Sequence, residues 1–248
     1  MKILAVYSMK GGVGKTATAV NLSYLASRDG SRTLLWDLDP QSSATFYLRV
    51  KPKVPGGGKK LIKGKKDTDE ILKGTDFECF DLLPGDFSYR KFDLLLGDRN
   101  KAVKRLRRIA GQFDGSFDCL ILDCPPGLSV LSEAVLQVAD LLLVPTIPTP
   151  LSLRTLELIG SYFEKRDLDG GRVRPFFCMV DRRKSLHRSI CENPPSGPFT
   201  FLEVEIPYSS LVEKMGLKRA PLGAFAPSSR PGRAFAELWT SARALLAI

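Results

Sequence analysis

A glycine-rich segment near the start of the chain contains the residue types that bind phosphate. Residues 10–16 read Lys-Gly-Gly-Val-Gly-Lys-Thr and follow an apolar run at residues 3–7. Glycines allow backbone N–H groups to turn toward phosphate oxygens, and the dipole of a following helix adds positive potential. In such a loop Lys15 reaches the β- and γ-phosphates, and the Thr16 hydroxyl is a ligand of Mg²⁺. The segment therefore predicts a site for a nucleoside triphosphate and magnesium.

Short apolar runs alternate with helical patterns along the chain. This alternation predicts an α/β fold with a mostly parallel, twisted sheet and helices on both faces. We expect strands at residues 3–7, 33–36, 119–122, 141–144, 176–180 and 201–206, with a short one at 80–83. A helix is expected from Lys15 to about Arg28, with Gly30 as its stop. We expect residues 1–248 to form a single domain.

Acidic residues directly follow three of the expected strands. Asp37 and Asp39 come after residues 33–36, Asp123 after 119–122 and Asp181 after 176–180. Ligands of doubly covered parallel sheets bind beyond the carboxyl ends of the strands. We therefore expect these carboxylates to lie near the glycine-rich loop.

Composition excludes several kinds of site. The chain has a single histidine, His187, and five cysteines without a Cys-x-x-Cys pair. A histidine-rich metal site is excluded, and a cysteine-ligated cluster or a disulfide framework is disfavoured. No apolar run approaches the roughly 18 residues of a membrane span, and the first residues lack a signal-peptide cleavage site. We expect a cytoplasmic protein with no integral membrane segment.

The chain is strongly basic. Lysine and arginine number 37 against 27 aspartates and glutamates, which gives a net charge of +10. This balance favours an anionic partner, which can be nucleic acid, acidic lipid or acidic protein. Residues 51–66 contain seven lysines and no acidic residue, with glycines at 56, 57 and 58. We expect a flexible basic surface loop there, either without a partner or as part of such a binding surface.

Three motifs in this order resemble those of the deviant Walker A ATPases of the ParA/MinD family. They are KGGVGKT at 10–16, DLDPQ at 37–41 and LILDCPPG at 120–127. Met9 stands where the common phosphate-loop pattern has its first glycine, and Lys10 occupies the position of this family's signature lysine. The resemblance implies a P-loop NTPase fold, ATP and Mg²⁺ as ligands, and slow hydrolysis that a partner stimulates.

The resemblance also implies a role for each matching residue. Lys10 would reach the partner's nucleotide across an ATP-dependent homodimer, Lys15 would bind phosphate within its own chain, and Asp39 would position or activate the attacking water. Magnesium would be held by Thr16, Asp37 and Asp123. The implied nucleotide-binding residues are Gly11, Gly12, Val13, Gly14, Lys15, Thr16, Ala17, Asp181 and Pro207.

One position departs from the family. A second threonine commonly follows the Lys-Thr pair, and its hydroxyl contacts the nucleotide, whereas this chain has Ala17. We expect nucleotide binding to survive this loss because the backbone donors remain. The chain also lacks an N/TKxD guanine motif, which favours ATP over GTP.

The resemblance includes several functional branches. A ParA-type partition ATPase would bind nonspecific DNA on the nucleoid and position a plasmid, a chromosome locus, a chemoreceptor cluster or a carboxysome, with a cargo-linked adaptor protein stimulating it. The DNA-binding residues expected in that case are Arg182, Arg183, Lys184, Lys214, Lys218 and Arg219. One alternative is a MinD-like membrane-associated ATPase that would use the amphipathic residues 234–248. Another is a nucleotide-dependent ligase or amidase-like enzyme acting on a small molecule.

Overall fold

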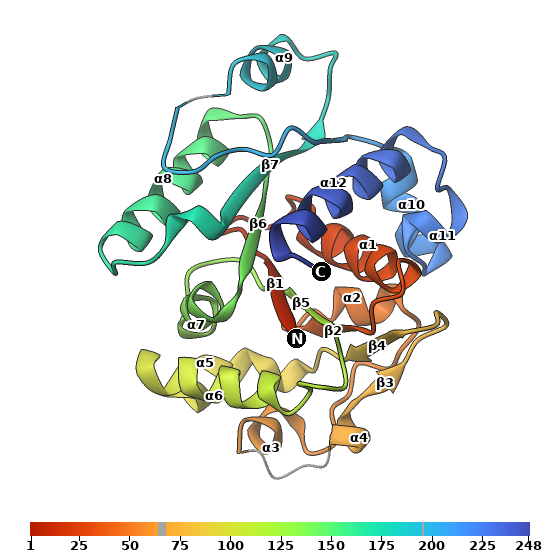
Figure 1. Ribbon diagram of the computed structural model, residues 1–248, viewed down its shortest axis with the longest axis vertical. Helices are drawn as coiled ribbons and strands as arrows, with labels where there is room; N and C mark the ends of the chain where they lie inside the picture. Colours follow the sequence, from red (N-terminus) through yellow and green to blue (C-terminus); the bar gives the residue numbers. More distant parts are fainter. Residues whose placement is uncertain (64–67, 195) are drawn as a thin grey trace.

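A single eight-stranded sheet runs through the computed structural model, which describes residues 1–63, 68–194 and 196–248 (Figure 1). The strands are β1 (Lys2–Val6), β2 (Thr33–Asp37), β3 (Lys73–Gly74), β4 (Phe80–Leu83), β5 (Cys119–Asp123), β6 (Leu141–Thr146), β7 (Val173–Val180) and β8 (Glu205–Pro207). Their order across the sheet is β3-β4-β2-β5-β1-β6-β7-β8. Neighbouring strands are parallel, except that β3 is antiparallel to β4. The predicted α/β class is confirmed.

Helices cover both faces of the sheet (Figure 1). One face packs against α1 (Lys15–Arg28), α2 (Ser43–Tyr47), α10 (Ser210–Lys218), α11 (Leu222–Phe225) and α12 (Arg230–Leu246). The other packs against α3 (Gly57–Lys63), α5 (Phe92–Leu96), α6 (Arg99–Gly111), α7 (Val130–Val138) and α8 (Pro150–Glu164). The remaining elements are α4 (Thr68–Ile71), α9 (Ser185–Glu192) and the 3-10 helices η1 (Phe87–Lys91) and η2 (Gly170–Arg172).

The two cores follow from the alternation of side chains along each strand. Leu35 of β2 enters the core beneath α1, whereas Leu34 and Trp36 enter the core beneath α6 and α7. All five residues of β2 and of β5 are buried, as expected for strands covered on both faces. This is why the apolar runs are continuous in the sequence instead of alternating with polar residues.

The predicted strand boundaries are nearly correct in the centre of the sheet and less so at its edges. The helix predicted from Lys15 to about Arg28 matches α1, and Gly30 adopts a positive φ of 90° just beyond it. The strand predicted at 201–206 forms only over Glu205–Pro207. The two-residue strand β3 has no apolar run that could have predicted it.

The expectation of a flexible loop at residues 51–66 is wrong for Gly57–Lys63, which form α3. Leu61 and Ile62 are buried against the core, and Arg108 of α6 donates a hydrogen bond to the Ile62 carbonyl. A Cβ at Gly58 would come within 2.3 Å of the Phe92 ring, so this glycine permits close packing. Lys65 and Lys66 lie outside the described residues.

No helix in the described part of the chain is long and apolar enough to cross a bilayer. The apolar stripe of α12, including Phe235, Leu238 and Trp239, is buried in the core against α1.

Candidate nucleotide site

The glycine-rich loop joins β1 to α1 at the carboxyl edge of the sheet, as predicted. Gly14, just before α1, has a φ of 95°, and a Cβ there would lie 2.9 Å from the Cys178 sulfur. Both its conformation and this close approach therefore require glycine. Because α1 begins at Lys15, its unpaired N–H groups and dipole point into the loop, which is the arrangement that binds phosphate.

Lys15 lies inside this loop. Its ammonium group donates a hydrogen bond to the Lys10 carbonyl oxygen at 2.7 Å, and the side chain is buried. Burial lowers the pKa of Lys15, and the negative charges of Asp123 and Asp39 oppose that shift. An anionic phosphate at the loop would compensate this buried positive charge far better than a neutral carbonyl does.

Asp123, at the end of β5, is a buried carboxylate without a partner. It is fully buried, and neither of its oxygens accepts a hydrogen bond within the described residues. Burial and the charge of Asp37 raise the pKa of Asp123 well above its usual range. A carboxylate in this position fits a divalent cation, which would satisfy its oxygens and offset its charge.

The donor set suits magnesium better than a metal with an all-protein cage. No group of three or more His, Cys, Asp or Glu side chains able to hold a metal occurs among the described residues. Magnesium typically uses one or two carboxylates together with phosphate oxygens and water. Asp123 and the Thr16 hydroxyl could supply the protein ligands, with the remainder coming from a bound nucleotide.

Asp37, unlike Asp123, accepts hydrogen bonds through both of its carboxylate oxygens. One of its oxygens accepts from the Thr45 backbone N–H at 2.9 Å and from the Thr45 hydroxyl at 2.7 Å, and the other accepts from the Asp39 N–H at 3.2 Å. Burial raises the pKa of Asp37 to about 6. Asp37 was expected to hold magnesium, but these bonds engage both of its oxygens. They fix the segment after β2, so Asp37 orients Asp39.

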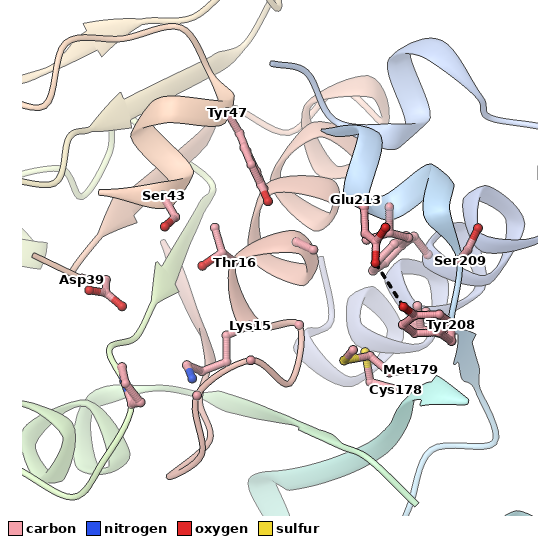
Figure 2. A pocket seen from close by; sticks show the side chains of 18 of the residues that line it. Lys15, Thr16, Asp39, Ser43, Tyr47, Cys178, Met179, Tyr208, Ser209 and Glu213 are labelled. Atoms are coloured by element: carbon pink, nitrogen blue, oxygen red, sulfur yellow. Dashed lines mark hydrogen bonds between the residues drawn. The ribbon is translucent and has the colours of Figure 1, made fainter. Parts of the chain in front are cut away.

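A cavity of about 380 Å³ opens beside the loop, a size within the range of ligand sites (Figure 2). The loop and the start of α1 line one part of it, together with Asp39, Gln41, Ser43 and Tyr47 from the segment after β2. The other part is lined by residues from the ends of β7 and β8 and from α10 and α12. These are Cys178, Met179, Ile206, Pro207, Tyr208, Ser209, Val212, Glu213 and Phe235.

Most of the predicted nucleotide residues meet in this cavity. Lining it are Gly11, Gly12, Gly14, Lys15, Thr16, Ala17, Asp39 and Pro207. Val13 is buried within the loop and does not line the cavity. Lys10 also does not line it, because its ammonium group donates to the Ser152 hydroxyl at 3.4 Å, near the start of α8.

The structure does not bring the Asp181 side chain to the cavity, contrary to the sequence expectation. Its carboxylate instead accepts hydrogen bonds from Arg183 at 2.9 Å. Arg183 holds the pKa of Asp181 down to about 2 through these bonds. The neighbouring residues of β7, Cys178 and Met179, occupy the cavity wall instead.

Sequence reasoning missed two features of the cavity. Tyr47 extends from α2 toward Thr16, and Glu213 of α10 accepts a hydrogen bond from the Tyr208 hydroxyl at 3.2 Å (Figure 2). Glu213 lies in α10, seven residues beyond the last predicted strand, where no sequence pattern marks it. Tyr47 lies eight residues beyond Asp39 on a short helix, where no sequence pattern marks it.

Tyr47 can supply a hydroxyl near the position where Ala17 lacks one. Among the described residues its hydroxyl has no hydrogen-bond partner, and both residues line the same cavity. We expect Tyr47→Phe to weaken ATP binding roughly fivefold, the effect of losing one hydrogen bond of about 1 kcal/mol. Isothermal titration calorimetry measures this change, with Tyr24→Phe, outside the cavity, as the matched control.

A double variant makes this prediction sharper. Adding Ala17→Thr to Tyr47→Phe restores a hydroxyl from α1, and we expect the lost affinity to return. Equal affinities of the Tyr47→Phe and unsubstituted proteins would remove the Tyr47 hydroxyl from nucleotide binding.

The six cations expected to bind DNA fall into two groups. Arg182 forms an ion pair with Glu205 at 2.6 Å, Arg183 pairs with Asp181, and Arg219 donates to the Phe46 carbonyl at 2.9 Å. By contrast, the exposed side chains of Lys184, Lys214 and Lys218 form no ion pair within the described residues. Lys184, Lys214 and Lys218 are therefore available to bind an external anion, whereas Arg182, Arg183 and Arg219 already have partners within the protein.

Comparison with known proteins identifies the family. Residues 1–167 match the family model AAA_31, described as an AAA domain. The chain belongs to this family of ParA/MinD-type P-loop ATPases. The three motifs that carried the resemblance, at 10–16, 37–41 and 120–127, all lie inside the matched residues.

Individual relatives agree with this assignment. The chain is 34% identical to the sporulation initiation inhibitor protein Soj of Bacillus subtilis over 145 residues, which is 58% of this chain and 57% of Soj. It is 28% identical to the chromosome partitioning protein ParA of Caulobacter vibrioides over 209 residues, 78% of this chain and 75% of that one. The match to Soj therefore spans less than two thirds of that relative.

One solved structure is similar to almost the whole of this chain. Cobyrinic acid a,c-diamide synthase from Mycobacterium smegmatis, with bound ADP and magnesium, superposes with a TM-score of 0.79 at 26% sequence identity. The similarity covers 98% of this chain and 94% of the synthase. This confirms the predicted P-loop fold.

Proposed function

We propose that this protein is an ATPase that dimerises on binding ATP, binds DNA without sequence preference and hydrolyses ATP to segregate or position a cargo. The proposal rests mainly on the position of the phosphate-binding loop, which lies at a cavity that Asp39 also lines. Asp123, whose carboxylate oxygens have no hydrogen-bond partner among the described residues, is nearby. The relatives Soj and ParA support the partition branch.

The residues divide the chemistry among them. Lys15 and the loop N–H groups bind the phosphates, and Asp39, at the cavity wall, orients the attacking water. Thr16 and Asp123 would hold Mg²⁺, which when bound supplies positive charge to the phosphate oxygens. Asp37 keeps the Asp39 segment in place through Thr45.

Lys10 supports the dimer. It lies at the edge of the loop but contacts Ser152, outside its own cavity. In a sandwich of two chains it can reach the partner's nucleotide, where a second positive charge would stabilise the charge that develops during phosphoryl transfer. Each site is then complete only when ATP brings two chains together.

We expect Lys10→Ala to retain ATP binding within about threefold but to remain monomeric with ATP. The reason is that the substitution removes a charge from the partner's site and none from the cavity of its own chain. Size-exclusion chromatography with light scattering checks this result, with Lys2→Ala, another exposed lysine on the same strand–loop unit, as the control. A dimer of unchanged stability would refute the role of Lys10 across the interface.

DNA binding and its cellular consequences are part of the same proposal. The net charge of +10 provides a sequence-independent attraction to phosphate backbones. Lys184, Lys214 and Lys218 are the predicted DNA-binding residues that are free to make such contacts. The protein would then reside in the cytoplasm on the nucleoid, and a cargo-linked adaptor protein would stimulate hydrolysis and release it.

A small-molecule enzyme is the second candidate, favoured by the likeness to cobyrinic acid a,c-diamide synthase. Such an enzyme would need a substrate pocket next to the γ-phosphate instead of a second chain. A Lys10→Ala protein with full activity as a monomer would favour this candidate. The MinD-like alternative has less support, because the apolar stripe of α12 is buried in the core.

A further inference from the structure

A basic face that the sequence motifs do not mark lies on α6 and α3. Helix α6 carries six lysines and arginines in 13 residues and no acidic residue. Helix α3 lies beside it and is joined to it by the hydrogen bond from Arg108 to the Ile62 carbonyl. We call these exposed cations the α3–α6 face: Lys59, Lys60, Lys63, Lys104, Arg107 and Arg108.

The cations of the α3–α6 face have no ion-pair partner among the residues that the structure describes. None of its six side chains pairs there with an acidic side chain. Two acidic residues near α6 are engaged elsewhere: Asp98 pairs with Lys101 at 2.7 Å, and Glu133 pairs with Arg99. Asp93 accepts a hydrogen bond from the Leu131 N–H at 3.0 Å.

The arrangement of cations on α6 is unfavourable for the isolated helix. Lys104 lies three residues before Arg107 and four before Arg108, so the three charges are neighbours on the helix surface. Like charges at these spacings destabilise a helix, and a bound polyanion would relieve the repulsion. The buried side of α6, with Leu106 and Ile109, packs in the core, so the charged side alone faces outward.

The α3–α6 face is separate from the six C-terminal cations expected to bind DNA, and its Lys59, Lys60 and Lys63 belong to the basic segment 51–66. Figure 1 shows α3 and α6 in the lower half of the molecule, whereas α9 and α10 lie in the upper half. In the upper group, Arg182 and Arg183 form ion pairs with acidic side chains. The lower group therefore offers more unpaired positive charge than the upper group.

The chemistry of the face favours nucleic acid over a lipid surface. A helix that binds at a membrane interface inserts apolar side chains between lipids. Within α3 and α6 no large apolar side chain is exposed, because Leu61, Ile62, Leu106 and Ile109 are buried. The exposed Phe87 and Leu94 belong to the adjoining η1 and α5. Exposed lysines and arginines can contact phosphate backbones without reading bases.

We propose that the α3–α6 face is a contact surface for the phosphate backbone of double-stranded DNA. The inference rests on the proposed function, because it assigns the surface through which the ATP-bound protein holds DNA. Lys104 and Arg107 would each neutralise one phosphate, and α3 would add its lysines alongside. DNA affinity would then depend on residues far from the six C-terminal cations predicted to bind DNA.

The test compares three double variants in which two cations become glutamine. Lys104→Gln/Arg107→Gln changes the α3–α6 face, Lys214→Gln/Lys218→Gln changes α10, and Arg230→Gln/Arg233→Gln on α12 is the charge-matched control. Fluorescence anisotropy measures binding of each ATP-bound protein to a random-sequence duplex over a salt series. Thermal unfolding and ATP turnover confirm that each variant folds and binds nucleotide.

We expect Lys104→Gln/Arg107→Gln to weaken DNA binding about tenfold or more, and to reduce the slope of log affinity against log salt by about 2. The α12 control should match the unsubstituted protein. If the α3–α6 variant binds normally while the α10 variant binds weakly, the inference is overturned and the proposed function stands. If the unsubstituted protein binds no DNA with ATP, the proposed function itself fails.

Vesicles provide the second arm of the test. Flotation with phosphatidylglycerol vesicles should give no binding that depends on Lys104 and Arg107. Binding to these vesicles that Lys104→Gln/Arg107→Gln abolishes, with DNA binding unchanged, would assign the face to a membrane and overturn the inference.

Discussion

Lys15→Ala is expected to abolish ATP binding while leaving the protein folded. The side chain would make two charge-assisted bonds to phosphate, and losing about 3–6 kcal/mol corresponds to at least a roughly hundredfold weaker affinity. Lys15 is a buried cation whose side chain, within the described residues, donates a hydrogen bond only to the Lys10 carbonyl, so its removal should not lower the stability of the nucleotide-free protein. Calorimetric titration with ATP measures the affinity.

Thermal unfolding separates a binding defect from a folding defect. In the unsubstituted protein, ATP and Mg²⁺ should raise the unfolding temperature, because a ligand that binds the folded state stabilises it. In Lys15→Ala the nucleotide-free unfolding temperature should be equal or higher, and ATP should no longer raise it. A Lys15→Ala protein that binds ATP with unchanged affinity would mean that the loop does not hold the phosphates as described.

Asp39→Ala is expected to bind ATP and to lose hydrolysis by a factor of about 10²–10⁴, the usual contribution of a group that positions or activates the attacking water. Asp39 lines the cavity, but its backbone is fixed by Asp37 and its carboxylate accepts a bond only from the Gln41 N–H, at 2.9 Å, within the described residues. Its removal should therefore leave the cavity intact. Single-turnover hydrolysis and equilibrium binding, measured on the same preparation, test both parts.

The control for Asp39→Ala is Asp76→Ala, which removes an exposed carboxylate far along the chain from the nucleotide motifs. It should hydrolyse ATP at the normal rate. Asp39→Ala with ATP should also stay dimeric, because in the proposed mechanism hydrolysis releases the two chains. Normal turnover by Asp39→Ala would exclude Asp39 from the mechanism.

The parts of the site that are determined by short segments of the chain could be predicted from the sequence. The loop at 10–16, the carboxylates Asp39 and Asp123, and the helix α1 each depend on a short segment whose glycines, charges and apolar pattern allow few conformations. The central strands were predicted because they are buried on both faces and therefore continuously apolar. These features place Lys15, Thr16 and Asp39 around one cavity.

What the sequence did not predict depends on contacts between distant segments. Arg182 was expected at a DNA surface, but it pairs with Glu205, a residue of the neighbouring strand. The glycines at 56–58 indicated flexibility, whereas Gly58 permits close contact with Phe92 and so stabilises α3. Asp181 follows its strand as expected, but Arg183 engages it. In each case the partner residue decides the outcome, and its proximity becomes known only from the fold.

The central claim is that ATP switches this protein into a DNA-binding form. The most direct measurement is the affinity for random-sequence duplex DNA of the protein without nucleotide, with ADP and with ATP, and of Asp39→Ala with ATP, over a salt series. Tight, salt-sensitive binding is expected with ATP alone, and the most persistent binding is expected for Asp39→Ala, because its ATP is not hydrolysed. Equal DNA affinity in all nucleotide states, or no binding in any of them, would contradict it.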